Sequence, residues 1–166
     1  MLDSVVADAI HDGEIPGAVV LVWHNGQVVY RKAFGNRALE PQREAMTVDT
    51  IFDVASLTKV VATTTAVMQL VQKGAVRLND PVAKYIPEFA DNGKQDTTVR
   101  NLLTHYSGLR EDLDLAEAWK GRDTAFRMAF AERPAYSPGS RFLYSDINFI
   151  TLGALVERVT GTTLDA

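Results

Sequence analysis

The stretch "FDVASLTKVV", Phe52–Val61, places Ser56 and Lys59 three residues apart at the start of a mostly apolar run that continues to Gln72. Residues three apart on a helix lie on the same face, so the lysine can reach the serine hydroxyl and accept its proton. The alternative is an ordinary helix start, with Ser56 as the N-cap and Lys59 solvated in the first turn. The S-x-x-K spacing alone is weak, because about one chain in two of this length carries it by chance.

The expected helix over 56–73 places Lys59 on its apolar side. At 100° per residue, the positions that share this face with Lys59 are Ser56, Val60, Thr63, Val67 and Leu70. Lysine is rare on such a face unless it is paired or functional, and in the first turn it opposes the helix dipole. Burial lowers the pKa of a lysine, and a serine nucleophile needs an adjacent base. The position of Lys59 therefore favours a catalytic pair.

The composition excludes several classes of function. The 166 residues carry a net charge of −4 with scattered basic residues, which argues against a nucleic-acid partner. The absence of cysteine removes disulfides, thiolate metal sites and a cysteine nucleophile. The three histidines lie far apart and form no H-E-x-x-H pattern, so we expect neither a metal nor another cofactor.

Hydropathy indicates a globular chain and leaves the compartment open. No segment approaches the roughly 18 apolar residues that span a bilayer, so we expect no membrane span. The N-terminus carries acids early and no basic region, and does not read as a signal peptide. The protein is therefore either cytoplasmic or exported with its signal removed.

The remaining pattern predicts a few strands followed mainly by helices. Asn25-Gly26 is a strong hairpin signal between two β-rich runs. The expected strands are 18–24, 27–34 and 50–53. The expected helices are 3–12, 56–73, a short one beginning at Asp80-Pro81, another ending before Ser107-Gly108, 114–132 in two pieces broken at Gly121, and 147–160 with Gly161 at its end.

Four segments carry a resemblance to a known family. "FDVASLTKVVATTTAVMQLV" resembles the nucleophile helix of the serine β-lactamase and penicillin-binding protein superfamily, in the branch of class C β-lactamases, related esterases and DD-peptidases. The segments "VRNLLTHYSGL", "PGSRFLYSDINFITLGALVERVTG" and "VWHNGQVVYRKAFGNRAL" are similar to a helix-turn signature, the Y-x-N segment and the opening hairpin of that branch. The order and the 88-residue distance from Ser56 to Tyr144 also fit.

The resemblance implies a role for each matching residue. Ser56 would be the nucleophile that forms an acyl-enzyme, and its backbone N–H one half of the oxyanion hole. Lys59 would activate Ser56, directly or through Tyr144, and Tyr144 would pass the proton to the leaving group. Which of the two is the base stays open. His105, in "THYSGL", would be structural and close a turn.

Asp146 departs from the family pattern, because Y-x-N reads Tyr144-Ser145-Asp146 here. An ionised carboxylate only accepts hydrogen bonds. Beside Lys59 it would favour the charged amine and shift the work of the base toward Tyr144. It would also repel the carboxylate of a penicillin, which favours ester or amide substrates. Alternatively, Ser145 or Asp146 caps the helix that starts at Ile147.

A second departure is the absence of K-T-G, the third motif of the superfamily, which lies on a later strand of chains about twice this long. We therefore expect residues 1–166 to be the N-terminal part of one β-lactamase-like domain, with strands near 18–53 and a helical region over 56–166. The implied fold is α/β (α+β): an antiparallel sheet flanked by helices, plus an all-helical region. Alone, the chain would be inactive and would require a complementing C-terminal segment of the same protein.

Two functions follow as expectations. The first is a serine hydrolase that acts through an acyl-enzyme on a small-molecule ester, β-lactam or D-amino-acid peptide. The second is a non-catalytic homologue that binds an acyl ligand or penicillin in the same cleft. Asp146 and the missing third motif keep the second alternative open.

Overall fold

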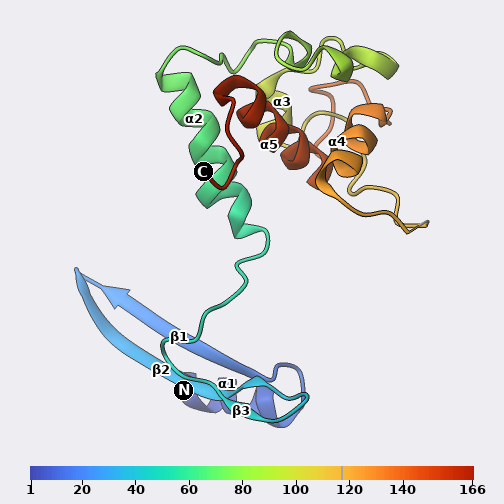
Figure 1. Cartoon of the computed structure of the whole chain (residues 1–166). Coiled ribbons are helices and arrows are strands. Elements are labelled where there is room, and N and C mark those ends of the chain that lie inside the picture. The colour runs from blue at the N-terminus through green and yellow to red at the C-terminus, as the bar shows by residue number, and fades with distance from the viewer. Residues whose placement is uncertain (117) are drawn as a thin grey trace. The chain divides into compact units, whose positions relative to one another are not determined.

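The computed structural model describes residues 1–116 and 118–166, which form two compact units, Met1–Asp53 and Val54–Ala166. In Figure 1 the first unit runs from blue to cyan, and the second continues through green and yellow to red. The first contains α1 (Leu2–His11), β1 (Gly17–His24), β2 (Gln27–Ala38) and β3 (Glu44–Ala45). The second contains η1 (Lys59–Thr63), α2 (Thr64–Gln72), η2 (Val82–Lys84), η3 (Pro87–Gly93), α3 (Val99–Leu103), α4 (Arg122–Ala131) and α5 (Asp146–Thr160). The predicted fold class, mixed α/β with an antiparallel sheet and a helical region, is confirmed.

The first unit is built on the predicted hairpin. β1 and β2 pair antiparallel, from Gly17 opposite Gly35 to His24 opposite Gln27. Asn25 and Gly26 have φ of 47° and 80°, as a two-residue turn with both central residues at positive φ requires. The turn type matches the right-handed twist of the strands, and the two residues fix the register next to the turn. A β-bulge then shifts the register by one residue between Val22 and Trp23.

The third strand lies elsewhere than expected. β3 is Glu44–Ala45 and pairs with β2 at Asn36 and Ala38, whereas the strand predicted at 50–53 is absent from the described structure. The β-rich composition of 50–53 was misleading because a strand depends on a cross-strand partner. Ile51 is almost fully exposed there.

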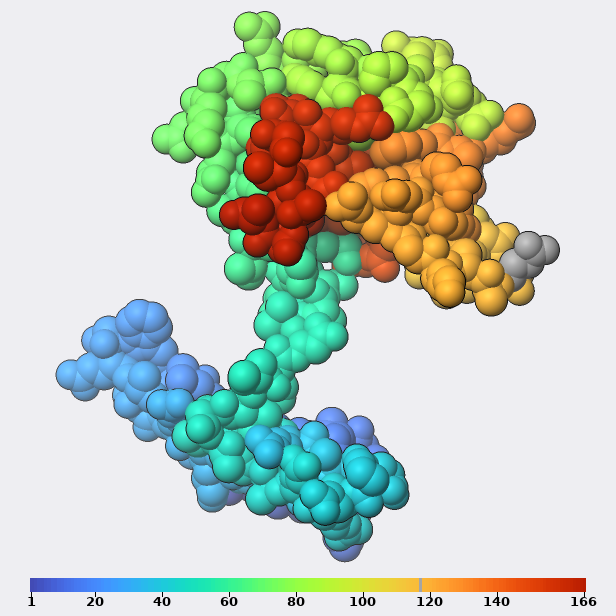
Figure 2. Space-filling model, in the orientation of Figure 1, coloured from blue at the N-terminus to red at the C-terminus, as the bar shows by residue number. Residues whose placement is uncertain are grey.

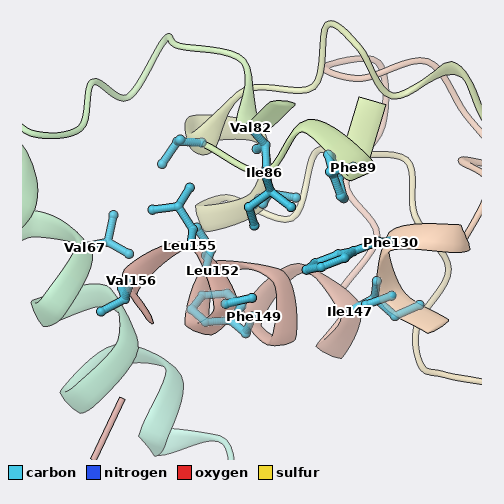
Figure 3. Packing of buried hydrophobic residues seen from close by; sticks show 14 of the residues in the cluster. Val67, Val82, Ile86, Phe89, Phe130, Ile147, Phe149, Leu152, Leu155 and Val156 are labelled. Atoms are coloured by element: carbon cyan, nitrogen blue, oxygen red, sulfur yellow. The ribbon is translucent and has the colours of Figure 1, made fainter. Parts of the chain in front are cut away.

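The second unit packs around α5. The buried residues of α5 include Ile147, Phe149, Leu152, Leu155 and Val156. Figure 3 shows them facing apolar side chains from α2 (Val67), η2 (Val82), the link between η2 and η3 (Ile86), η3 (Phe89) and α4 (Phe130). α5 ends as predicted at Gly161, whose φ of 73° is the left-handed conformation that closes a helix. The helix that begins with Asp146 is therefore held on several sides, which fixes the position of its first turn.

Two predicted helix starts are wrong. Residues 114–121 form no helix where they are described, and Glu117 lies outside the described residues. The Asp114 carboxylate accepts the N–H of Ala116 at 2.9 Å, and its carbonyl accepts the Trp119 indole N–H at 3.0 Å, so local side-chain bonds replace the helical ones. At Asp80-Pro81, Pro81 is extended and precedes a short 3₁₀ turn instead of opening the helix.

α5 lies against α4, and the red and orange surfaces adjoin in Figure 2. A hollow of about 380 Å³ separates α4, the end of α5 and the terminal turn. No helix in residues 1–116 and 118–166 is both long and apolar enough to cross a bilayer.

Candidate active site

Ser56 lies in a turn that leads into a π-helical turn, η1, and then α2. Ala55, immediately before it, has φ of 43°, a conformation that alanine rarely adopts. Single π turns are rare and occur frequently at functional sites. The wide turn also changes the predicted helical face: Lys59 and Thr63 point inward as expected, but Val60 is 59% exposed.

Lys59 connects the predicted catalytic residues. Its Nζ donates to Ser56 Oγ at 3.1 Å and pairs with Asp146 Oδ1 at 2.6 Å. The same ammonium lies 5.2 Å from the centre of the Tyr144 ring. Its side chain is 15% exposed, so the ion pair lies in surroundings that screen it less than bulk water.

The pKa of Lys59 is raised. Burial acts against the charged amine, but hydrogen bonds to Asp146 and Tyr144 and the charges of both groups outweigh it. The expectation that burial lowers the pKa of Lys59 is therefore wrong, because the effect of burial is offset by a carboxylate. Lys59 is an ammonium at neutral pH, as the carboxylate at position 146 predicts.

Tyr144 is positioned where the turn at residues 105–108 meets the loop at residues 135–143. Three backbone hydrogen bonds join them: the N–H groups of Ala135, Gly139 and Leu143 donate to the carbonyls of Gly108 (2.8 Å), Tyr106 (2.7 Å) and His105 (2.9 Å). The two segments approach so closely at Gly108 that a Cβ there would lie 1.9 Å from the carbonyl oxygen of Tyr136. The glycine therefore permits the contact that brings Tyr144 to the site.

The pKa of Tyr144 is lowered. Hydrogen bonding to Ser56 is the main cause, followed by hydrogen bonding to Lys59 and the charge of that ammonium. Asp146 acts in the opposite direction, because its negative charge disfavours a phenolate. Of the two candidate bases, Lys59 and Tyr144, Tyr144 is the one whose pKa is shifted toward the deprotonated form.

Asp146 reaches the site from the first turn of α5. Its backbone N–H donates to the carbonyl of Glu111 at 2.7 Å, and a carboxylate in this position is favoured by the helix dipole. Ser145 holds the cap position, but its hydroxyl donates to the carbonyl of Arg110 at 2.6 Å and caps nothing. The expected capping role is therefore wrong for the Ser145 side chain.

A hollow of about 350 Å³ opens beside the Lys59–Asp146 pair, within the size range of small-molecule sites. Its polar wall includes Asp112 and Asp146, and its apolar wall includes Phe149 and Ile150. The space can receive part of a small ligand next to the ion pair.

The structure brings together all four residues predicted from the sequence: Ser56, Lys59, Tyr144 and Asp146. The contact of His105 with Tyr144 was not predicted. The His105 and Tyr144 rings stack with centroids 4.4 Å apart and planes at 27°. The spacing of the two residues gives no such signal, because the contact depends on the loop between them.

Comparison with known proteins gives matches over nearly the whole chain. The family model described as Beta-lactamase matches residues 2–166. A provisionally named D-alanyl-D-alanine carboxypeptidase of Escherichia coli (strain K12) is 35% identical over 90% of this chain and 39% of its own length. Esterase EstB of Burkholderia gladioli is 34% identical over 99% of this chain and 46% of its own.

A solved class C beta-lactamase has a similar structure. It superposes with a TM-score of 0.79 and 29% identity, over 98% of this chain and 44% of that one. The chain therefore spans less than half the length of these relatives. The resemblance found in the four sequence segments is confirmed for all three kinds of protein.

Proposed function

The chain belongs to the beta-lactamase family, and from this premise we propose that Ser56 is the nucleophile of a serine hydrolase that forms an acyl-enzyme. The observation that carries the proposal is the position of the Lys59 ammonium, 3.1 Å from Ser56 Oγ and 2.6 Å from Asp146. The family includes hydrolases, as the esterase and beta-lactamase names of the relatives indicate.

In the proposed acylation step, Ser56 Oγ forms a bond to the carbonyl carbon of the substrate while its proton passes to the Tyr144 phenolate. Tyr144 then gives that proton to the leaving group as the bond from carbon to the leaving group breaks. Lys59 stays charged, stabilises the phenolate and orients the serine hydroxyl. The raised pKa of Lys59 and the lowered pKa of Tyr144 support this division of roles.

A water molecule then attacks the acyl-enzyme, and Tyr144 accepts its proton before returning one to Ser56. The backbone N–H of Ser56 is proposed as one donor to the oxyanion. A second donor is proposed to come from a complementing segment of the same protein, because the third family motif is absent from the sequence of these 166 residues.

The proposed substrates are esters or amides whose reacting end is uncharged or cationic. Asp146 places a carboxylate where the family pattern has an amide, and a carboxylate repels the acid group of a penicillin or a free D-amino acid. Among the kinds named for the relatives, an esterase agrees best with this charge.

Labelling of Ser56 tests the proposal. The native protein that contains this chain is treated with a fluorophosphonate, and the adduct is mapped by mass spectrometry. We expect one adduct on Ser56, loss of labelling in Ser56→Ala, and a fall in ester turnover of at least about 1,000-fold. The matched control, Ser4→Ala, changes an exposed serine of the first unit and should keep full labelling. Full turnover in Ser56→Ala would refute the proposal.

The second candidate is a binding homologue that retains the cleft without the chemistry. Asp146 motivates it, because the carboxylate holds Lys59 in a form that cannot accept a proton. This candidate predicts saturable binding of an acyl ligand with no covalent adduct. The same mass spectra distinguish the two candidates.

A further inference from the structure

We propose that His105 is a positioning residue for Tyr144, held by Asn148 and Ser107 in the neutral form that carries its ring proton on Nε2. The inference rests on the proposed function for its catalytic meaning, but the geometry that carries it lies outside the predicted catalytic set. The backbone N–H of Leu109, the Ser107 hydroxyl and the Asn148 amide form a series of hydrogen bonds that ends on the His105 imidazole.

The direction of each hydrogen bond in this chain is fixed by the one before it. The backbone N–H of Leu109 donates to Ser107 Oγ at 3.1 Å, so the hydroxyl donates onward to Asn148 Oδ1 at 2.6 Å. With its oxygen engaged, Asn148 presents its amide nitrogen to His105 Nδ1 at 3.4 Å. Ser107 and Asn148 are buried, so no solvent competes for these groups.

His105 Nδ1 receives a second donor from the backbone. The N–H of Ser145 donates to it at 3.0 Å. A nitrogen that faces two donors carries a lone pair, and the ring proton then lies on Nε2. The surroundings of the ring also favour the neutral imidazole. Burial and the Lys59 ammonium both lower the pKa of His105, and Asp146 opposes them with a smaller effect.

The fixed ring supports Tyr144 from one side. The two rings stack at 4.4 Å, and the Ser145 N–H that binds His105 belongs to the residue after Tyr144. Phe142 and Phe149 contact other parts of the imidazole, at 5.9 Å and 5.3 Å between centroids. Removal of the ring would leave Tyr144, which is 43% exposed, free to move away from Ser56 and Lys59.

His105→Asn is the variant that tests this role with the least disturbance of the turn. His105 has φ of 60°, a conformation that asparagine tolerates well. The ionisation of the Tyr144 phenol is followed by NMR in protein labelled with [¹³Cζ]tyrosine. The variant Tyr144→Phe assigns its signal among the five tyrosines of the sequence. We expect the pKa of Tyr144 to rise toward its ordinary value, because the hydrogen bonds to Ser56 and Lys59 are lost.

Acylation provides the second readout in the native protein. A misplacement of about 1 Å can cost about 100-fold, and we expect fluorophosphonate labelling of His105→Asn to slow by about 10- to 100-fold. An unchanged Tyr144 titration in a variant that keeps the wild-type NMR signals of the α5 core would overturn the proposal. If Ser56 were never labelled, the proposed function would fail, and the Tyr144 titration would still decide the role of His105.

The tautomer gives a direct test that needs no variant. Long-range ¹H–¹⁵N spectra of the imidazole should show an unprotonated Nδ1 at neutral pH. A protonated Nδ1 would overturn the proposal. In Asn148→Asp the carboxylate should instead draw the proton onto Nδ1, and Asn148→Ser, which can still donate, should retain the wild-type tautomer.

Discussion

Lys59 and Lys94 are both lysines that the second unit takes out of water. Each ammonium lies over an aromatic ring: Lys59 is 5.2 Å from the centre of Tyr144, and Lys94 is 5.0 Å from that of Phe89. Lys94 is fully buried, whereas the Lys59 side chain is 15% exposed. By burial alone, Lys94 would be the stronger candidate for a functional lysine.

The two lysines differ in the kind of group that each contacts. Within residues 1–116 and 118–166, Lys94 donates only to backbone carbonyls, those of Asp91 (2.8 Å), Phe130 (2.9 Å) and Glu132 (2.6 Å). Lys59 instead contacts a hydroxyl, a phenol and a carboxylate, which can exchange protons. Consequently the pKa of Lys94 is lowered, chiefly by burial, while that of Lys59 is raised. A buried lysine is informative about function through its partners, and Lys94 is a structural cation that joins η3 to the end of α4.

Removal of Lys94 is the largest effect we expect. Lys94→Met fills a similar volume but leaves three carbonyls without their donor, which should lower the free energy of unfolding by about 3–5 kcal/mol. Urea unfolding of the chain measures this loss. The matched variant, Lys59→Met, should cost less than about 1 kcal/mol, because a partly exposed ion pair contributes little. Equal losses would remove the distinction between the two lysines.

Asp146→Asn tests whether the carboxylate causes the difference between the pKa shifts of Lys59 and Lys94. Without the carboxylate, Lys59 keeps its burial but loses its strongest partner, so its pKa should fall, in the direction that Lys94 already shows. The pKa of Tyr144 should fall as well, since Asp146 acts to raise it. Chain labelled with [¹³Cε]lysine and [¹³Cζ]tyrosine reports both titrations. Asp112→Asn, on the rim of the same hollow, is the control and should leave Lys59 unchanged.

A smaller effect is expected in the dependence of stability on alkaline pH. The raised pKa of Lys59 stabilises the fold below pH 10.5, and this contribution is lost as the pH rises through the folded-state pKa. The lowered pKa of Lys94 has the opposite sign, so stability rises between that pKa and 10.5. Relative to Lys59→Met the wild type should therefore lose stability at high pH, and relative to Lys94→Met it should gain. Urea titrations from pH 8 to 11 would show whether the two trends diverge.

The site around Lys59 could be predicted from the sequence because the partners of this lysine lie in short motifs. Ser56 lies three residues away, and the Tyr144–Asp146 motif follows from the family resemblance, so spacing and resemblance sufficed. The hairpin at Asn25-Gly26 was equally local, since two adjacent residues fix its turn. Whether Ser56 and Tyr144 have the proposed catalytic roles stays a prediction.

The partners of Lys94 and the contacts of His105 could not be predicted in the same way. "DNGKQD" around Lys94 resembles a polar surface loop, and two of its partners come from the far end of α4. The role of His105 depends on a loop that returns some 40 residues later. The π turn was also missed, because a 3.6-residue period cannot reveal one wide turn. These features are set by tertiary packing, which local patterns do not encode.

Lys84 is the case in which we expect the smallest effect. Like Lys59 it pairs with a carboxylate, Asp80, at 2.6 Å, and lies over a ring, that of Tyr85, at 5.4 Å. The Lys84 side chain is 57% exposed, however. Asp80 also accepts the hydroxyl of Tyr85 at 2.7 Å, so the carboxylate keeps a partner when the lysine is removed. Lys84→Met should leave the urea midpoint of unfolding unchanged within error, since water and salt screen such pairs. A loss comparable to that of Lys94→Met would mean that contact geometry, rather than burial and the kind of partner, determines what a lysine contributes to this fold.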